Sequence, residues 1–394
     1  MSIIIFGDLF TFPDGQAATN RVYTYAKGFK ENGINVHVIC FSSNYMDDHN
    51  GVVDGITYYH TFTTPKRSNY FIIRRWHNLI KYFRTYYLVR KINREDKVLA
   101  ISRWTNTLSI HLFIWLLSKS AKAKLIIESS EHPLRYHQKG LWNKKRGVIQ
   151  FYIESYLCDG IFCISRYLIN FHKERGIKER KLFLLPSTVD PSRFIRTGER
   201  PFDNPYIGYF GSLSFKRDSV DLLIKAFAQF SNSHPEVYLV LGGFCDEGQK
   251  RQMADLITQL NIAKKVKILD PLTRGEIIAY INYADILVMV RSKDIESDAS
   301  YPSKLTEFLS TGRPVVTVNV GEIADYLSDG VNAYLVEPHN PEAMADKLNY
   351  VYDNYDLAEQ AGQRGKELTA GVFNYYYQSK RMIDFINSLS PKKS

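Results

Sequence analysis

The chain alternates short apolar runs with amphipathic stretches along almost its whole length, and this alternation limits the possible folds more than any other feature. The runs are rich in Val, Ile, Leu, Phe and Tyr, and examples are IIIFG (3–7), VHVICF (36–41), VLAIS (98–102), KLIIES (124–129), YIGYFG (206–211), VYLVLGG (237–243) and PVVTVNV (314–320). Strands separated by helical segments predict parallel sheets that are covered by helices on both faces. We therefore expect an α/β protein with doubly wound, Rossmann-like sheets.

The length of 394 residues predicts two domains, because a single core rarely grows that large. A segment rich in Pro, Asp, Arg and Gly separates two regions of strand and helix alternation. We predict an N-terminal domain over residues 1–187, a linker over 188–204 and a C-terminal domain over 205–375. Residues 376–394 are predicted to form a helix that packs back on the N-terminal domain. Ligands of open parallel sheets bind beyond the carboxyl ends of the strands, so a cleft between the domains is the expected active site.

Composition favours a soluble cytoplasmic protein. No apolar run has the roughly 18 to 20 residues of a membrane span, and LSIHLFIWLLS (108–118) is predicted to be a buried helix. The N-terminus has no basic leader or cleavage site, so no signal peptide is expected. The four cysteines have no metal-binding or redox spacing, which indicates reduced structural thiols.

Charge is divided unequally between the two halves. Residues 1–200 hold 31 Lys or Arg and 16 Asp or Glu, a net charge of +15, whereas residues 201–394 hold 20 and 25, a net charge of −5. A basic half favours an anionic partner such as a phospholipid surface, a polyphosphate or a nucleic acid. No nucleic-acid-binding motif accompanies the charge, so we expect no nucleic-acid partner.

The segment YPSKLTEFLSTGRPVV (301–316) has the pattern of a phosphate-binding helix start. Ser303 is predicted to cap a helix over 304–311 that ends at Gly312. A capping box needs its acid three residues after the cap, so Glu307 is not explained by capping. The free N–H groups and positive dipole end could hold a phosphate, while Glu307 could accept hydrogen bonds from a ribose diol. A capped surface helix with a solvated Glu307 is the alternative.

A second segment, YIGYFGSLSFKRDSVDLLIKAF (206–227), ends a strand at Gly211 and then carries Lys216 and Arg217. Glycine lets a ligand approach the backbone, and the two cations could neutralise a leaving diphosphate. The loop does not have the P-loop pattern, and no GxGxxG follows an early strand. A solvated Lys-Arg loop is the alternative.

Two segments of the N-terminal half place polar residues beyond strands. A Pro-Asp-Gly turn ending at Gly15 precedes a helix that bears Arg21, and IIESSEHPLRYH (126–137) delivers Glu131 and His132 to the end of a strand. The carboxyl end of a parallel strand is where catalytic polar groups are expected. A structural histidine is the alternative for His132.

In this order the four segments resemble those of glycosyltransferase family 4, which are retaining GT-B enzymes that use nucleotide sugars. Support comes from LPSTVDPSRF (185–194), GEIADYLSDGVNAYLVEP (321–338) and KLTEFLSTGRPVV (304–316), the last of which is similar to the second half of the family's Glu-x7-Glu motif. The resemblance covers nearly the whole chain and is strongest from 205 to 338. It implies two Rossmann-like domains facing a central cleft, and a bacterial enzyme of surface-polysaccharide synthesis.

By position, the resemblance implies a role for each candidate residue. The donor ribose would bind Glu307, and the diphosphate would bind the backbone of the helix start with Lys216 or Arg217. Residues implied to contact the donor are Gly15, Gly211, Ser212, Pro271, Leu272, Ser303, Lys304, Leu305 and Glu307. Residues implied to act in catalysis are Glu131, His132, Lys216 and Arg217. No Asp-x-Asp triplet occurs, so we expect neither a metal nor a cofactor, with the nucleotide sugar as donor substrate.

Two positions depart from the family pattern. Ala299 stands where the family has its first motif glutamate, and the nearest carboxylates are Glu296 and Asp298. Ser212 stands where many members have an arginine after the glycine of the phosphate loop. The first departure affects sugar recognition and the second weakens the phosphate clamp.

A basic and aromatic segment at 65–94 has nine Lys or Arg and no acid. Its apolar residues keep helical spacing, which fits a helix packed on its sheet with a solvated basic side. The alternative is contact with an anionic membrane where a lipid-linked acceptor resides, through Arg74, Arg75 and Trp76, with Arg21 also on the acceptor side. A second cluster, at Lys139, Lys144, Lys145 and Arg146, favours this alternative.

These observations predict a transferase that moves a sugar from a nucleoside-diphosphate donor to a saccharide or lipid-linked saccharide. Two other functions stay open. One is an epimerase or a phosphorylase of the same fold. The epimerase would turn over the donor without an acceptor, and the phosphorylase would require free phosphate. A catalytically silent binder of nucleotide sugar or polysaccharide is favoured by Ala299.

Overall fold

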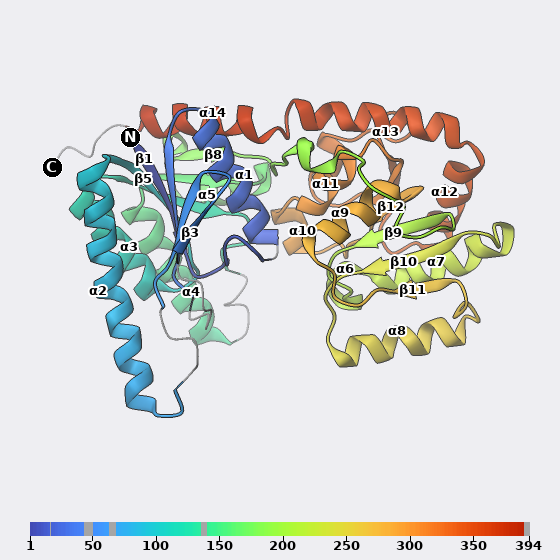
Figure 1. Cartoon of the computed structure of the whole chain (residues 1–394), viewed down its shortest axis with the longest axis horizontal. Coiled ribbons are helices and arrows are strands. Elements are labelled where there is room, and N and C mark those ends of the chain that lie inside the picture. The colour runs from blue at the N-terminus through green and yellow to red at the C-terminus, as the bar shows by residue number, and fades with distance from the viewer. Residues whose placement is uncertain (16, 43–49, 63–67, 135–139, 390–394) are drawn as a thin grey trace. The chain divides into compact units, whose positions relative to one another are not determined.

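The computed structural model describes residues 1–15, 17–42, 50–62, 68–134 and 140–389, together with the backbone but not the side chain of Leu141. Within these residues the chain divides into two compact units (Figure 1). Unit 1 comprises Met1–Thr188 and the segment from Tyr375, and unit 2 comprises Val189–Asn374. Of the predicted linker over 188–204, Thr188 belongs to unit 1, and residues 189–204 belong to unit 2 and include the 3₁₀ helix η3 (Pro191–Phe194).

Unit 1 is built on an eight-stranded sheet in the order β3-β4-β2-β1-β5-β6-β7-β8. All its neighbouring strands are parallel except the pair β3 and β4. The strands are β1 (Ser2–Gly7), β2 (Asn35–Cys40), β3 (Asn50–Val53), β4 (Ile56–His60), β5 (Val98–Trp104), β6 (Lys124–Ser129), β7 (Gly160–Cys163) and β8 (Leu182–Leu184). The helices are α1 (Ala17–Glu31), α2 (Phe71–Glu95), α3 (Leu108–Ala121), α4 (Leu141–Leu157), α5 (Arg166–Glu174), η2 (Glu179–Lys181) and α14 (Tyr375–Ser388).

Unit 2 is built on a six-stranded parallel sheet in the order β11-β10-β9-β12-β13-β14. Its strands are β9 (Tyr206–Phe210), β10 (Tyr238–Gly242), β11 (Val266–Ile268), β12 (Ile286–Met289), β13 (Val315–Val318) and β14 (Tyr334–Val336). Its helices are α6 (Phe215–Asp218), α7 (Val220–Ser233), α8 (Glu247–Gln259), α9 (Arg274–Tyr283), α10 (Ile295–Ala299), α11 (Ser303–Ser310), η4 (Ile323–Asp325), α12 (Pro341–Asp353) and α13 (Tyr355–Ala370). The strand order reverses between β9 and β12, and such a switch point is where open α/β sheets bind ligands.

The prediction of an α/β chain with two Rossmann-like sheets is confirmed. Strand β3, which was not predicted, joins β4 through a turn in which Asp54 and Gly55 both have positive φ. An Asp-Gly pair with this geometry is a common hairpin turn.

The core of unit 1 also includes the C-terminal helix. Met382 and Ile386 of α14 lie among the buried residues that pack on β1 and α1. Tyr375 donates a hydrogen bond to Glu31 at 2.7 Å and receives Lys27 over its ring. The C-terminal helix therefore belongs structurally to unit 1.

The prediction that residues 108–118 form a buried helix is only partly right for α3. Ile110, Ile114 and Leu117 are buried, but Leu112 and Leu116 are exposed. None of the helices among the described residues is both long and apolar enough to cross a membrane.

His111 of α3 is completely buried, and neither ring nitrogen has a hydrogen-bond partner among the described residues. Burial, assisted by Arg103, lowers the pKa of His111 to about 3. The folded protein thus holds this histidine neutral, whereas the unfolded chain binds a proton near pH 6.5.

We expect acidification below about pH 6.5 to lower the free energy of unfolding, with His111 adding about 1.4 kcal/mol per pH unit until pH approaches its folded pKa. The sign follows because the unfolded state binds the proton and the folded state does not. His111→Phe should reduce the slope of stability against pH by about one proton, measured by urea unfolding between about pH 7 and 4.5. The exposed His339→Asn serves as the control. Equal slopes for His111→Phe and the native chain would contradict this assignment.

Candidate active site

The carboxyl ends of β9 and β12 bring a cluster of charged side chains together in unit 2. Lys304 of α11 donates hydrogen bonds to the Tyr209 hydroxyl at 2.6 Å and to Asp218 at 3.0 Å. Burial lowers the pKa of Lys304, Asp218 opposes this shift, and Arg291 and Arg217 add to it. Two arginines therefore act electrostatically on a lysine that one buried carboxylate holds in place.

Arg291 lies two residues after the end of β12 and is 9% exposed. Its guanidinium donates to the Ser300 hydroxyl at 2.8 Å. Burial lowers the pKa of Arg291, and the positive charge of Arg217 lowers it further. Since arginine stays protonated even after such shifts, the end of β12 carries a fixed and largely dehydrated positive charge.

Gly211 lets Lys304 cross the end of β9. A Cβ at Gly211 would lie 2.8 Å from the Lys304 ammonium nitrogen, so a side chain here would displace it. The next residue, Ser212, accepts a hydrogen bond from Tyr209 at its carbonyl oxygen at 2.8 Å. The predicted phosphate loop is therefore covered by the lysine of the predicted phosphate helix.

Lys216 and Arg217 are exposed and lie on α6. Their carbonyl oxygens accept hydrogen bonds from Ser292, at 2.8 Å from its hydroxyl and 3.2 Å from its backbone N–H. These bonds tie the loop after β12 to α6. Of these two exposed cations, Arg217 is the one whose charge lowers the pKa of both Lys304 and Arg291.

Helix α11 begins one residue earlier than predicted. Pro302 is the N-cap residue, Ser303 is the first helical residue, and no side chain of the described residues caps this end. Proline fixes its own φ near the value found here, −70°, which favours this start over one capped by serine. Leu305 is buried and anchors the first turn, while Gly312 has the positive φ expected of a helix stop. The uncapped start, beside Lys304, keeps the features of an anion site.

Glu307 is paired with a residue that the sequence did not predict. Arg274, the first residue of α9, contacts both carboxylate oxygens of Glu307, at 2.6 and 3.3 Å. The Glu307 side chain is 12% exposed, so the alternative of a solvated glutamate is wrong. A two-point arginine contact fixes the plane of the carboxylate.

The remaining donor-side candidates lie in two further places of unit 2. Pro271 is exposed and Leu272 half-buried, in the loop that leads into the capping box of Thr273 and Glu276 at α9. Ala299 is completely buried at the end of α10. Its methyl group therefore packs inside the unit where a glutamate was expected from the family pattern.

In unit 1, His132 follows β6 and is 7% exposed. Its ring lies 4.7 Å from that of Phe171, and Nδ1 accepts a hydrogen bond from the Leu134 backbone at 3.3 Å. Burial, helped by Arg175, lowers the pKa of His132, so the ring is neutral at pH 7. The neighbouring Glu131 is half-buried.

Arg21 is buried in unit 1 and forms an ion pair with Glu128 at the end of β6. It also donates to the Tyr25 hydroxyl at 3.0 Å and lies 5.6 Å from the Trp104 ring centre. Burial raises the pKa of Glu128, although Arg21 opposes that shift. The Arg21 side chain lies inside the unit and is 6% exposed, and its predicted place on the acceptor side stays a prediction.

Gly15 lies in a loop that closes on itself. Thr11 donates to the Asp14 carbonyl, and Thr19 donates to the Thr11 carbonyl at 2.6 Å. An added Cβ at Gly15 would overlap both threonine hydroxyls. The glycine therefore allows this turn to form, and its predicted contact with a donor stays a prediction.

Sequence reasoning missed four residues of these sites, namely Asp218, Arg274, Arg291 and Glu128. A signal existed for two of them. Arg291 directly follows an apolar strand run, and Glu128 sits within the last residues of another. Polar residues at the ends of such runs reach the ligand-binding edge of a parallel sheet. Asp218 and Arg274 carried no comparable signal.

Comparison with known proteins finds a family match for residues 193–368. They match the family described as Glycosyl transferases group 1. A D-inositol 3-phosphate glycosyltransferase from Corynebacterium urealyticum is 25% identical over 198 residues, 48% of this chain and 44% of that protein. One from Streptomyces griseus is 30% identical over 149 residues, 36% of this chain and 30% of that protein. The matched region thus spans less than half the length of these relatives.

Solved structures share the fold over the whole chain. Sucrose-phosphate synthase from Thermosynechococcus elongatus has a TM-score of 0.75 at 15% identity, and the match covers 99% of each chain. Anabaena Alr3699/HepE in complex with UDP has a TM-score of 0.71 at 16% identity, covering 99% of this chain and 100% of that one. At these identities the likeness establishes the fold, which is the GT-B arrangement of two Rossmann-like domains, as predicted.

We expect Arg21→Met to lower the free energy of unfolding by about 3 to 5 kcal/mol, because it leaves the Glu128 carboxylate buried without its partner. The double variant Arg21→Met with Glu128→Gln should recover a large part of that loss. Chemical denaturation of the native chain, both single variants and the double variant gives the complete cycle. Additive losses would show that the two side chains do not depend on each other.

Proposed function

We propose that this chain, whose residues 193–368 form a Glycosyl transferases group 1 domain, transfers a sugar from a nucleoside-diphosphate donor to a saccharide or a lipid-linked saccharide. The transfer retains the anomeric configuration, requires no metal or cofactor, and serves surface-polysaccharide synthesis on the cytoplasmic side of the membrane. The observation that carries the proposal is the group of cations at the switch point of unit 2, Lys304, Arg291 and Arg217, beside the uncapped start of α11.

The proposed reaction is an exchange at the anomeric carbon. The bond from this carbon to the diphosphate oxygen breaks, the acceptor oxygen forms a bond to the same carbon, and the acceptor proton passes to the diphosphate. Retention requires that the acceptor approach the face that the diphosphate leaves. Negative charge grows on the diphosphate during this exchange, and fixed cations in a partly dehydrated site lower the barrier by several kcal/mol.

The three cations take different parts in this scheme. Lys304 is already bound to Asp218 and Tyr209, so it offers a positioned ammonium without reorganisation. Arg291 lies after β12, and we infer that it supplies the charge that many family members obtain from an arginine at the position of Ser212. Arg217 and Lys216 are exposed on α6 and can reach the outer phosphate.

On the nucleoside side, the Glu307 carboxylate accepts hydrogen bonds from the ribose hydroxyls, and Arg274 orients this carboxylate. Pro271 and Leu272 contact the base in this proposal. The structure of Anabaena Alr3699/HepE contains UDP, and a second one contains UDP-glucose. Uridine diphosphate is therefore the first nucleotide to test. In unit 1, Glu131 and the neutral His132 face the transferred sugar, and Gly15 lies against the donor.

A second function rests on one observation. Ala299 is buried where the family pattern has the first motif glutamate, so a contact to the donor sugar is absent from this position. A protein that binds nucleotide sugar without transferring it would show thermal stabilisation by donor and no release of nucleoside diphosphate. Turnover with a saccharide acceptor would reject this alternative.

We expect UDP at about 100 times its Kd to stabilise the protein by roughly 2.7 kcal/mol, with or without magnesium. Arg291→Gln should weaken binding about 10- to 100-fold, because it removes a charged hydrogen bond to phosphate. Arg251→Gln, an exposed change on α8, is the matched control. Thermal shifts across UDP, GDP, ADP, CMP and dTDP provide the measurement. Equal affinity of the Arg291→Gln and native proteins for every nucleotide would reject the assignment of Arg291.

Arg274→Lys tests whether the ribose site depends on the orientation of Glu307. Lysine keeps the positive charge but cannot make the two-point contact, so we expect nucleoside diphosphate to bind roughly tenfold more weakly. Inorganic diphosphate, which has no ribose, should bind the native protein and the variant equally. Calorimetry with both ligands separates these cases. If diphosphate lost as much affinity as the nucleotide, the arginine would be acting on phosphate instead.

A further inference from the structure

Most large apolar residues of helix α2 in unit 1 lie on its solvent-exposed face and not on its buried face. Its buried residues are Lys81, Thr85, Val89 and Ile92. The opposite stripe is apolar yet solvent-exposed, with Ile72 at 79%, Trp76 at 63%, Leu79 at 53%, Phe83 at 66% and Tyr87 at 69%. The expectation of an apolar face packed on the sheet with a solvated basic side is therefore wrong.

The inside of α2 shows why this orientation is stable. Lys81 donates to the Phe41 carbonyl oxygen at 3.1 Å, and its ammonium lies 4.1 Å from the centre of the Phe41 ring. Thr85 donates to the Lys81 carbonyl at 2.8 Å. Because the polar residues on the packed face are satisfied, the helix is held with its apolar stripe in water.

The first turns of α2 are exposed on nearly all sides. Tyr70, Phe71, Ile72, Ile73 and Trp76 are all exposed. Figure 1 shows these turns extending past the sheet of unit 1. A helix end of aromatic and branched apolar residues that projects from its domain is unusual for a surface in contact with water only.

The neighbouring helices continue the same surface. Helix α3 packs against both α2 and α4, and α3 and α4 each carry exposed apolar residues in addition to their buried ones. The exposed apolar residues are Leu112 and Leu116 on α3, and Trp142, Val148, Ile149, Tyr152 and Tyr156 on α4. We call these residues, with the exposed stripe of α2, the three-helix face.

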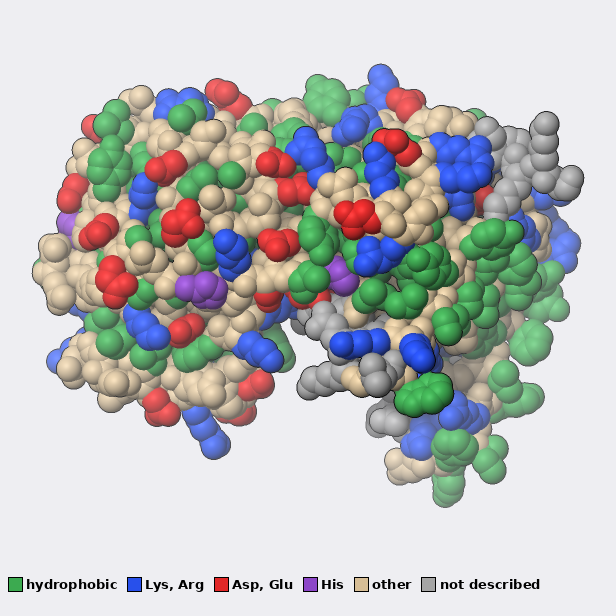
Figure 2. Space-filling model, turned by 180° about the vertical axis from the view of Figure 1, so that it is seen from behind, with side chains coloured by type: hydrophobic (Ala, Val, Ile, Leu, Met, Phe, Trp, Pro, Cys, Tyr) green, Lys and Arg blue, Asp and Glu red, His purple; other side chains and the backbone are tan. Residues whose placement is uncertain are grey.

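Positive charge accompanies the three-helix face. The exposed basic residues of these helices are Arg75, Arg84, Arg90, Lys91, Arg94, Lys119, Lys144, Lys145 and Arg146. Lys139, predicted to be part of this cluster, lies outside the described residues. Exposed acid on the same described helices is confined to Glu95. In Figure 2 the lower part of unit 1, on the right, shows hydrophobic and basic side chains gathered together, with hardly any acidic ones among them.

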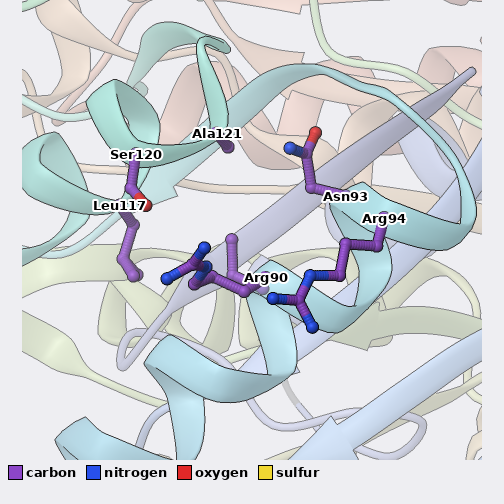
Figure 3. Close-up of a pocket in the computed structure, with 7 residues that line it drawn as sticks. Arg90, Asn93, Arg94, Leu117, Ser120 and Ala121 are labelled. Carbon is purple, nitrogen blue, oxygen red and sulfur yellow. The ribbon is translucent and has the colours of Figure 1, made fainter.

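A small pocket of about 90 Å³ lies between α2 and α3 at the C-terminal end of the α2 stripe. Figure 3 shows Arg90 and Arg94 on α2 beside this pocket, with Ser120 on α3. Two guanidinium groups and a hydroxyl can hold a phosphate group through charged hydrogen bonds. The pocket therefore adds a place for one lipid phosphate beside an apolar stripe.

We propose that the three-helix face docks this protein on an anionic lipid bilayer, with the apolar stripe of α2 in the interfacial region and Arg90 and Arg94 on lipid phosphate. Amphipathic helices bind in this way when their apolar side carries Trp, Phe and Leu and basic residues lie beside it. Tyr and Trp favour the level of the lipid headgroups, and Lys and Arg add attraction to anionic lipid. The docking rests on unit 1 alone and does not depend on the proposed transfer reaction.

The charge decides between a bilayer and a second copy of the chain. In a two-fold dimer through this face, each basic patch would meet the same patch of its partner. Nine exposed basic residues on each copy would then face like charges with little acid to compensate. An anionic bilayer offers both the apolar layer and the opposite charge, so the three-helix face fits a bilayer better.

The test is flotation of the full chain with phosphatidylcholine vesicles that contain about 30% phosphatidylglycerol, at low salt. We expect binding to these vesicles, little binding to pure phosphatidylcholine, and release at about 1 M salt. The double variant Trp76→Ser with Phe83→Ser should bind at least tenfold more weakly. The matched control replaces two exposed apolar residues of unit 2, Phe244→Ser with Leu357→Ser, and should bind like the native chain.

The arginine pair has its own comparison. Arg90→Gln with Arg94→Gln should reduce the preference for phosphatidylglycerol by about fivefold per charge, whereas Arg251→Gln should not. The proposal is overturned if the native chain stays unbound at low salt, or if the Trp76 and Phe83 variant binds as well as the control. It is also overturned if that variant converts a native dimer into monomers. Unchanged thermal stabilisation of both variants by UDP would show that nucleotide binding is a separate property.

Discussion

The contact on which the charged cluster of unit 2 depends is the one between Lys304 and Asp218. The carboxyl ends of β9 and β12 bring Arg291 and Arg217 close to that lysine, and like charges in a partly buried site repel each other. Asp218 compensates part of this repulsion and, with Tyr209, holds the ammonium over Gly211. The remaining positive charge is what an incoming diphosphate would neutralise.

Unit 1 also buries a positive charge, at the end of β6, but stabilises it in a different way. Arg21 is matched by Glu128 and enclosed by Tyr25 and Trp104, so its charge is compensated within the protein. A buried pair of this kind contributes little net stability, but breaking it is costly, which makes the geometry of α1 against β6 strict. Unit 2 thus gathers three cations around Asp218, whereas unit 1 pairs Arg21 with one buried carboxylate.

The strands and the α/β class could be predicted because most strands are continuous apolar runs, which can be recognised in the sequence without knowledge of tertiary contacts. The helix in the segment 301–316 was predicted to within one residue because its signals are local, although Pro302 and not Ser303 is the N-cap residue. The partners of Glu307 and Lys304 could not be predicted from the sequence. Arg274 and Asp218 come from other helices, and only the packing of the unit brings them next to Glu307 and Lys304. The Asp54-Gly55 hairpin did carry a local signal, but the strand before it is short and weakly apolar.

Helix α2 shows that helical spacing of apolar residues does not by itself predict which face of a helix is buried. Its apolar residues have helical spacing, and this pattern normally means that they face the core. The assumption fails here because a stripe with that spacing can face any apolar medium, and the core side is occupied by Lys81 and Thr85 with their own hydrogen bonds. Turning the helix by half a turn would bury Trp76 and Phe83 but would also remove Lys81 from the Phe41 carbonyl. The exposed stripe thus follows from a satisfied polar contact on the packed side.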